Sequence, residues 1–144
     1  MRKKIPIICL VSLFSVTYFW LFSAVPVYAN PQGPQVVNGQ ADFSNPNPQT
    51  LHVTNSPNAI INWQGFSIQQ HEVTRFIQQS ANSAVLNRVT GPDPSNLLGQ
   101  LLSNGRVFLI NPHGMVFGPN CVIDTAGLWH LPSTLRTRIF WRVT

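Results

Sequence analysis

Four carboxylates are the side chains of this sequence best suited to acid–base chemistry. They are Asp42, Glu72, Asp93 and Asp124, and each is far from the next along the chain. General-acid catalysis and glycoside hydrolysis both need two such groups held close together. Folding can bring distant residues together, but the wide spacing argues against an enzyme. We therefore expect no catalytic residues.

Metal and cofactor sites are not indicated either. The four histidines, His52, His71, His113 and His130, show none of the short spacings typical of metal ligands. We expect no metal and no cofactor.

Cysteine chemistry depends on the first 29 residues, because one of the two cysteines, Cys9, lies there. Once that segment is removed, only Cys121 remains and no intramolecular disulfide can form. Burial beside Val122 and Ile123 is the expected state of this lone thiol.

The net charge of +5 comes from nine basic and four acidic residues, and most of the basic residues lie at the two ends. Those at the ends are Arg2, Lys3, Lys4, Arg136, Arg138 and Arg142. Between them, three arginines and four carboxylates give a net charge of −1 and there is no lysine. Phosphate binding needs a basic stripe, so we expect no nucleic-acid partner.

The N-terminal segment is typical of an export signal. Three basic residues precede an apolar run over residues 5–24, and Val27 and Ala29 supply a small-residue cleavage pattern. We predict a signal peptide over residues 1–29, with cleavage after Ala29. A membrane anchor is the alternative, since about 20 apolar residues span a bilayer, but Pro26 favours cleavage.

Short apolar groups separated by turn residues make up the rest of the chain. Pro, Gly, Asn and Gln are frequent over residues 30–58, and apolar groups of three to five residues follow at regular intervals. This pattern predicts an all-β domain: a sandwich, a barrel or a solenoid. Asn and Gln can stack in ladders, and Gly, Asn and Pro suit sharp corners, so the solenoid is favoured. Residues 97–102 fit a helical face as well as a strand, and Gly99 favours a strand or an irregular segment.

Several motifs resemble one family. They are Asn62-Trp63-Gln64-Gly65-Phe66, then Leu86-Asn87-Arg88-Val89, then Phe108-Leu109-Ile110-Asn111-Pro112-His113-Gly114-Met115. Over residues 34–128 the chain is similar to the haemagglutination-activity domain, the N-terminal secretion domain of filamentous haemagglutinin-like exoproteins in two-partner secretion. The family's usual string is Asn-Pro-Asn-Gly-Ile or -Val, so His113 and Met115 depart from it. The turn depends on Asn111, Pro112 and Gly114, which are present.

The resemblance implies a right-handed parallel β-helix with an N-terminal cap. It also implies export by the Sec machinery, recognition by the POTRA domains of an outer-membrane transporter, and an adhesin-type passenger that meets any host receptor. The protein would then be secreted or on the cell surface. Asn87 and Arg88 would hold a turn or contact the transporter. Residues 111–115 would form a structural turn, with transporter contact as the alternative.

The resemblance ends at residue 128. A one-base shift of reading frame permits the family's usual continuation, Val-Ala-Ser-Thr-Leu, after Leu128. We therefore divide the chain into a signal peptide (1–29), a partial secretion domain (30–128) and a frameshifted tail (129–144). This hypothesis makes the β-helix incomplete at its C-terminus and the product a truncated, periplasmic fragment.

Two other functions remain open. One is a small secreted β-helix enzyme acting on polysaccharide, which would need clustered carboxylates or a Ca²⁺ site. The other is a carbohydrate-binding protein with Trp63, Phe66 and Phe76 as its stacking surface, although aromatics at such spacing are more often core residues.

Overall fold

The computed structural model describes residues 30–131, which contain strands and no helix. The strands are β1 (Gln35–Asn38), β2 (Ala41–Asn47), β3 (Thr50–Asn55), β4 (Ala59–Trp63), β5 (Val73–Ile77), β6 (Ala84–Val89), β7 (Ser95–Leu97), β8 (Gln100–Ser103), β9 (Arg106–Ile110), β10 (Met115–Phe117), β11 (Val122–Asp124) and β12 (Gly127–Leu131). The all-β prediction is confirmed. Within this part of the chain, no helix is long and apolar enough to cross a membrane.

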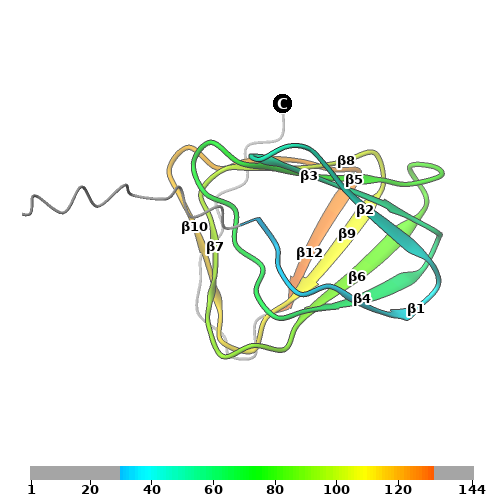
Figure 1. Cartoon of the computed structure of the whole chain (residues 1–144), viewed down its shortest axis with the longest axis horizontal. Coiled ribbons are helices and arrows are strands. Elements are labelled where there is room, and N and C mark those ends of the chain that lie inside the picture. Colours follow the sequence, from blue (N-terminus) through cyan, green and yellow to red (C-terminus); the bar gives the residue numbers. More distant parts are fainter. Residues whose placement is uncertain (1–29, 132–144) are drawn as a thin grey trace, which may run out of the picture.

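The strands form three sheets around a shared core, and together they give the triangular outline seen in Figure 1. Sheet I has the order β1-β4-β6-β9-β12, and sheet II has the order β11-β8-β5-β3-β2. Sheet III consists of β7 and β10. The chain visits sheets II, I and III in turn, so successive coils stack one on the next.

Parallel pairing in register defines the solenoid. Ala59 pairs with Val85, Val85 with Val107, and Val107 with Leu128, so one apolar inward position repeats through β4, β6, β9 and β12. Parallel strands need long crossovers, and here each crossover is the rest of one coil. The solenoid prediction is confirmed.

An antiparallel cap covers one end of the stack. β1 runs antiparallel to β4, and β2 runs antiparallel to β3, so a non-solenoid strand covers the first coil in both long sheets. The predicted N-terminal cap is confirmed.

Aromatic residues fill the core next to this cap. Trp63, Phe66 and Phe76 are at most 1% exposed. Trp63 meets Phe66 edge to face at 5.6 Å, and Phe66 stacks on Phe76 at 6.5 Å. These rings are core residues, so the hypothesis that they form a carbohydrate-stacking surface is wrong.

Residues 97–102 form the end of β7, a sharp corner and most of β8. A Cβ at Gly99 would lie 2.1 Å from the Gln69 carbonyl oxygen and 2.4 Å from that of Glu72. Only glycine fits such an approach. The strand-or-irregular interpretation is confirmed, and the helical alternative is wrong.

Polar ladders play less part than the sequence suggested. Asn87 has Ile61 and Leu109 as its neighbours in the parallel register, not other amides. Asn104 and Asn111 lie at corners, where they bind backbone groups of adjacent coils. These asparagines therefore stabilise the solenoid through individual hydrogen bonds.

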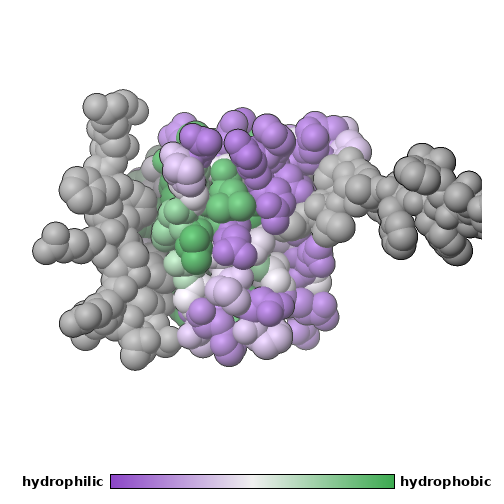
Figure 2. Space-filling view, turned by 90° about the vertical axis from the view of Figure 1, so that its left-hand side faces the viewer, coloured by the Kyte–Doolittle hydropathy of each residue, from purple (hydrophilic) through white to green (hydrophobic). Residues whose placement is uncertain are grey.

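The predicted domain boundary at residue 128 does not coincide with the end of a strand. That boundary falls within β12, which pairs with β9 as far as Leu131. Residues 132–144, like the predicted signal segment and Ala29, lie outside the residues that the structure describes. The face formed by β7 and β10 carries an apolar patch (Figure 2). On β10, Val116 is 52% exposed.

Candidate functional site

Asn111 anchors the corner between β9 and β10. Its side chain is fully buried, and its Nδ2 donates to the Asp93 carbonyl oxygen at 3.1 Å and to Ser95 Oγ at 2.9 Å. Its Oδ1 accepts from the His113 backbone N–H at 2.8 Å. Asn111 therefore joins its own turn to the preceding coil.

Gly114 completes this turn in a conformation that favours glycine. Its φ is +93°, and its N–H donates to the Asn111 carbonyl oxygen at 3.1 Å. Its carbonyl oxygen accepts from the Ser95 N–H at 3.0 Å. These bonds link Asn111, Gly114 and Ser95 around the turn.

The rest of the motif divides between surface and interior. Pro112 and His113 are exposed at the tip of the corner. Met115 is half-buried, starts β10 and packs against the core. Of this motif, Pro112 and His113 are the side chains most open to a partner.

Asn87 lies in the middle of β6 rather than in a turn, so the turn alternative is wrong for this residue. It is fully buried, and its Oδ1 accepts from Trp63 Nε1 at 2.9 Å. Its Nδ2 donates to the Phe108 carbonyl oxygen at 3.3 Å. The buried indole N–H needs an acceptor, and Asn87 supplies it across adjacent coils.

Arg88 points to the opposite side of β6 and is exposed. It pairs with Ile110, the residue directly before Asn111, so the two sequence motifs meet at one end of sheet I. We call Arg88, Pro112 and His113 the corner surface. It presents one guanidinium, one imidazole and a rigid turn, a combination suited to recognition rather than to catalysis.

The four carboxylates stay apart in the fold. Asp42 lies on β2, Asp124 on β11, and Asp93 in the corner after β6. Glu72 is buried before β5, where its Oε2 accepts from the Gln69 N–H at 2.8 Å. Among residues 30–131, no three His, Cys, Asp or Glu side chains gather as metal ligands would.

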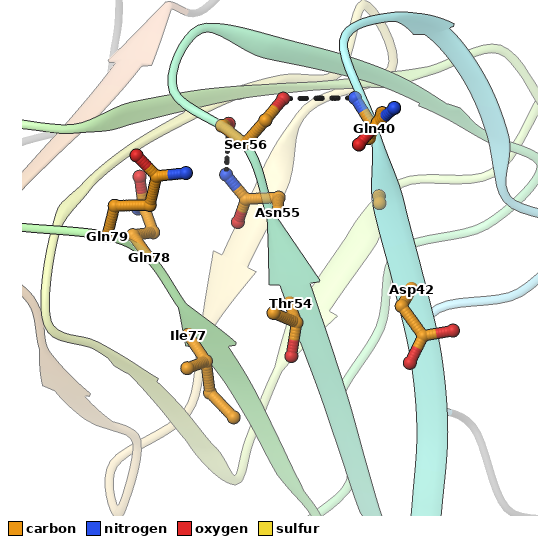
Figure 3. A pocket seen from close by; sticks show the side chains of 9 residues that line it. Gln40, Asp42, Thr54, Asn55, Ser56, Ile77, Gln78 and Gln79 are labelled. Carbon is orange, nitrogen blue, oxygen red and sulfur yellow. Dashed lines mark hydrogen bonds between the residues drawn. The ribbon is translucent and has the colours of Figure 1, made fainter.

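Two shallow hollows lie along sheet II. The larger, of about 490 Å³, is lined by the ends of β2, β3 and β5 (Figure 3). At its upper rim the Gln40 N–H donates to Ser56 Oγ at 3.0 Å, and Asn55 Nδ2 donates to the Ser56 carbonyl oxygen at 2.9 Å. The smaller, of about 360 Å³, lies between Arg75, Leu102 and Asp124. Sequence reasoning missed both, because such hollows depend on strand register.

Cys121 is half-buried rather than buried, next to an exposed Val122. Cys121 packs against the core, so the expected burial is met only in part. Partial burial still raises the pKa of its thiol, because desolvation disfavours the thiolate.

Comparison with known proteins gives consistent matches. The sequence profile of the TPS secretion domain, where TPS denotes two-partner secretion, matches residues 28–130. The crystal structure of the HMW1 secretion domain from Haemophilus influenzae aligns with a TM-score of 0.68 and 44% identity, covering 70% of this chain and 27% of that one.

Two curated relatives are also similar. A heme/hemopexin-binding protein of Haemophilus influenzae strain Rd is 38% identical over 99 residues, which cover 69% of this chain and 11% of the relative. A second protein of that name, from the same species, is 37% identical over 73 residues. The chain thus spans only a small part of the curated relatives it matches.

Proposed function

The chain belongs to the TPS secretion domain family, and from this premise we propose that residues 30–131 are the export-recognition module of a larger secreted protein. The match to a solved secretion domain, at 44% identity with a TM-score of 0.68, is the observation that carries this proposal. The family is a secretion domain, not an enzyme family, and its proteins leave the cell through the outer membrane.

The partner in this proposal is the outer-membrane transporter of the same two-partner system, met through its periplasmic POTRA domains. Recognition uses the corner surface, where Arg88 and His113 are exposed beside a turn held by Asn111. A turn fixed from within presents its side chains without a large loss of conformational entropy on binding.

The export route begins with the segment that precedes the described residues. Residues 1–29 direct the chain to the Sec machinery and are removed after Ala29. The domain precedes an adhesin-type passenger. Heme or hemopexin binding, named for the relatives, is not extended to this chain, which covers 11% of the longer match.

An export assay tests the proposal. The full chain is fused to a reporter enzyme and produced with and without the transporter of its own system. We expect reporter in the medium only when the transporter is present. Equal release without the transporter would contradict the proposed function.

Paired substitutions test the corner surface separately. Arg88→Ala combined with His113→Ala should lower transporter-dependent release at least tenfold, because recognition energy concentrates in few residues. The matched control combines Arg75→Ala with His71→Ala, since both of these side chains are exposed away from that corner. If both pairs reduce release equally, while urea unfolding shows both proteins folded, recognition does not use the corner surface.

A further inference from the structure

A row of apolar side chains crosses the outer face of sheet I. Ile60 pairs with Leu86, Leu86 with Phe108, and Phe108 with Trp129, one residue from each of four adjacent parallel strands. Neighbouring strands lie about 4.8 Å apart, so this outer apolar row extends along the solenoid axis. Its members alternate with the buried core positions and therefore point away from the core.

Exposure increases toward both ends of the row. Trp129 is 58% exposed, and its ring stacks on that of Phe108 at 6.2 Å with 12° between the planes. Val37, in the bulge of β1 beside Ile60, is 54% exposed. Ile60, Leu86 and Phe108 are half-buried between them.

Positive charge flanks the row on both sides. Arg88 follows Leu86 by two residues on β6, and Arg106 precedes Phe108 by two residues on β9, so both arginines face outward with the row. Arg106 also donates to the Asn82 carbonyl oxygen at 2.9 Å. Two of the three arginines within residues 30–131 thus lie on this face.

Negative charge is absent from the five strands of sheet I, none of which contains Asp or Glu. The nearest acidic residue along the chain is Asp124, which belongs to sheet II and precedes β12 by three residues. The outer face of sheet II differs, because the register of Arg75, Leu102 and Asp124 places both signs of charge in one row. Sheet I alone combines an uninterrupted apolar row with charge of one sign.

We propose that the outer face of sheet I binds an anionic lipid surface. Arginine beside apolar groups is attracted to acidic headgroups, while a half-exposed tryptophan suits the boundary between headgroups and acyl chains. The inner strands β4, β6 and β9 are paired on both sides, so their backbone groups need no further partner at that boundary. The inference rests on the proposed export only for bringing the domain to such a membrane, and the binding itself is tested without the transporter.

Vesicle binding tests this proposal with chain recovered from the periplasm. Binding is compared between vesicles of phosphatidylcholine alone and vesicles containing one third phosphatidylglycerol, at low and high salt. We expect flotation with the anionic vesicles only, reduced by salt. In a Trp141→Phe background, tryptophan emission should shift to shorter wavelength, and the shift should be lost when Trp129→Phe is added, because Trp63 is already buried.

Variants outside the corner surface keep this test independent of export. Arg106→Gln should lower partitioning about fivefold, the effect of one arginine near an acidic surface, and Trp129→Ser should lower it further. The matched control combines Arg75→Gln with Ile77→Ser on sheet II, where Ile77 is 40% exposed, and should leave partitioning unchanged.

Three outcomes would overturn the assignment. The first is equal flotation with neutral and anionic vesicles. The second is a loss of partitioning in the sheet II control equal to that in the sheet I variants. The third is no flotation together with Arg106-dependent binding to the purified POTRA domains. The last outcome would make this face a protein interface. Loss of export with vesicle binding intact would contradict the proposed function and leave the lipid assignment standing.

Discussion

Substituting Asn111 with alanine separates structural support from partner contact at the corner surface. The change leaves three groups without their present partner: the Asp93 carbonyl oxygen, Ser95 Oγ and the His113 N–H. We expect Asn111→Ala to destabilise the fold while leaving the exposed side chains of the corner chemically unchanged.

The expected loss follows from these bonds. Each hydrogen bond contributes about 1 kcal/mol, and a buried group left unpaired costs about 1 to 3 kcal/mol. Asn111 and Ser95 are both fully buried, so water cannot readily replace the missing amide. We expect the free energy of unfolding to fall by about 3 to 5 kcal/mol, a large part of the roughly 5 to 15 kcal/mol typical of a domain.

Urea unfolding followed by tryptophan fluorescence measures this loss, because Trp63 is buried in the folded chain. The matched control is Asn96→Ala on β7, because the half-buried Asn96 makes no side-chain hydrogen bond in the structure. This control should stay within about 0.5 kcal/mol of the parent chain. A loss below about 1 kcal/mol for Asn111→Ala, or an equal loss in both variants, would refute the reasoning from buried hydrogen bonds.

Three further changes probe other parts of the fold. Asn87→Leu leaves the buried Trp63 N–H without its acceptor, so thermal unfolding should show a loss of about 2 kcal/mol; an unchanged melting temperature would show that water satisfies this group. Gly99→Ala places a Cβ 2.1 Å from a carbonyl oxygen, and we expect little folded protein by circular dichroism, whereas a native spectrum would mean that the corner can shift. Burial raises the pKa of Cys121, so iodoacetamide at pH 8 should alkylate this thiol more slowly in the folded chain than in urea. The alkylation rate should increase as the pH rises. Equal rates in the folded chain and in urea would contradict this.

Local sequence signals predict the corners of this fold well. Asn111, Pro112 and Gly114 define a turn through backbone preferences that hardly depend on the rest of the molecule. The hydrogen bond from the His113 N–H to Asn111 is such a local feature. Short apolar groups between corners of this kind were enough to predict an all-β domain, and the corner residues, the expected polar ladders and the family resemblance favoured a solenoid.

The inward side of each strand was harder to predict. In β6 the apolar residues Val85, Leu86 and Val89 do not fit one alternating pattern, and the structure buries Val85, Asn87 and Val89. Asn87 faces inward because Trp63, on the preceding coil, needs an acceptor. That partner is 24 residues away in sequence, so no local pattern reveals the pairing.

Register between coils explains the remaining misses. Arg88 meets the corner surface because β6 pairs with β9, and the outer apolar row exists because four strands align at one position. Cys121 and Ile123 both pack against the core from the last coil described and stay half-buried there. Such features depend on the register in which coils of unequal length stack. That register cannot be predicted from a single sequence.

The antiparallel cap gives the stack a polarity. β1 and β2 occupy the positions beside β4 and β3 where a preceding parallel coil would pair, so coils can be added only on the side away from the cap. In a chain that crosses a membrane with its N-terminus ahead, the capped first coil would fold first. Each later coil could then pair with strands that are already folded. Folding then becomes a vectorial process, in which each added coil buries its apolar face and hinders the chain from sliding back.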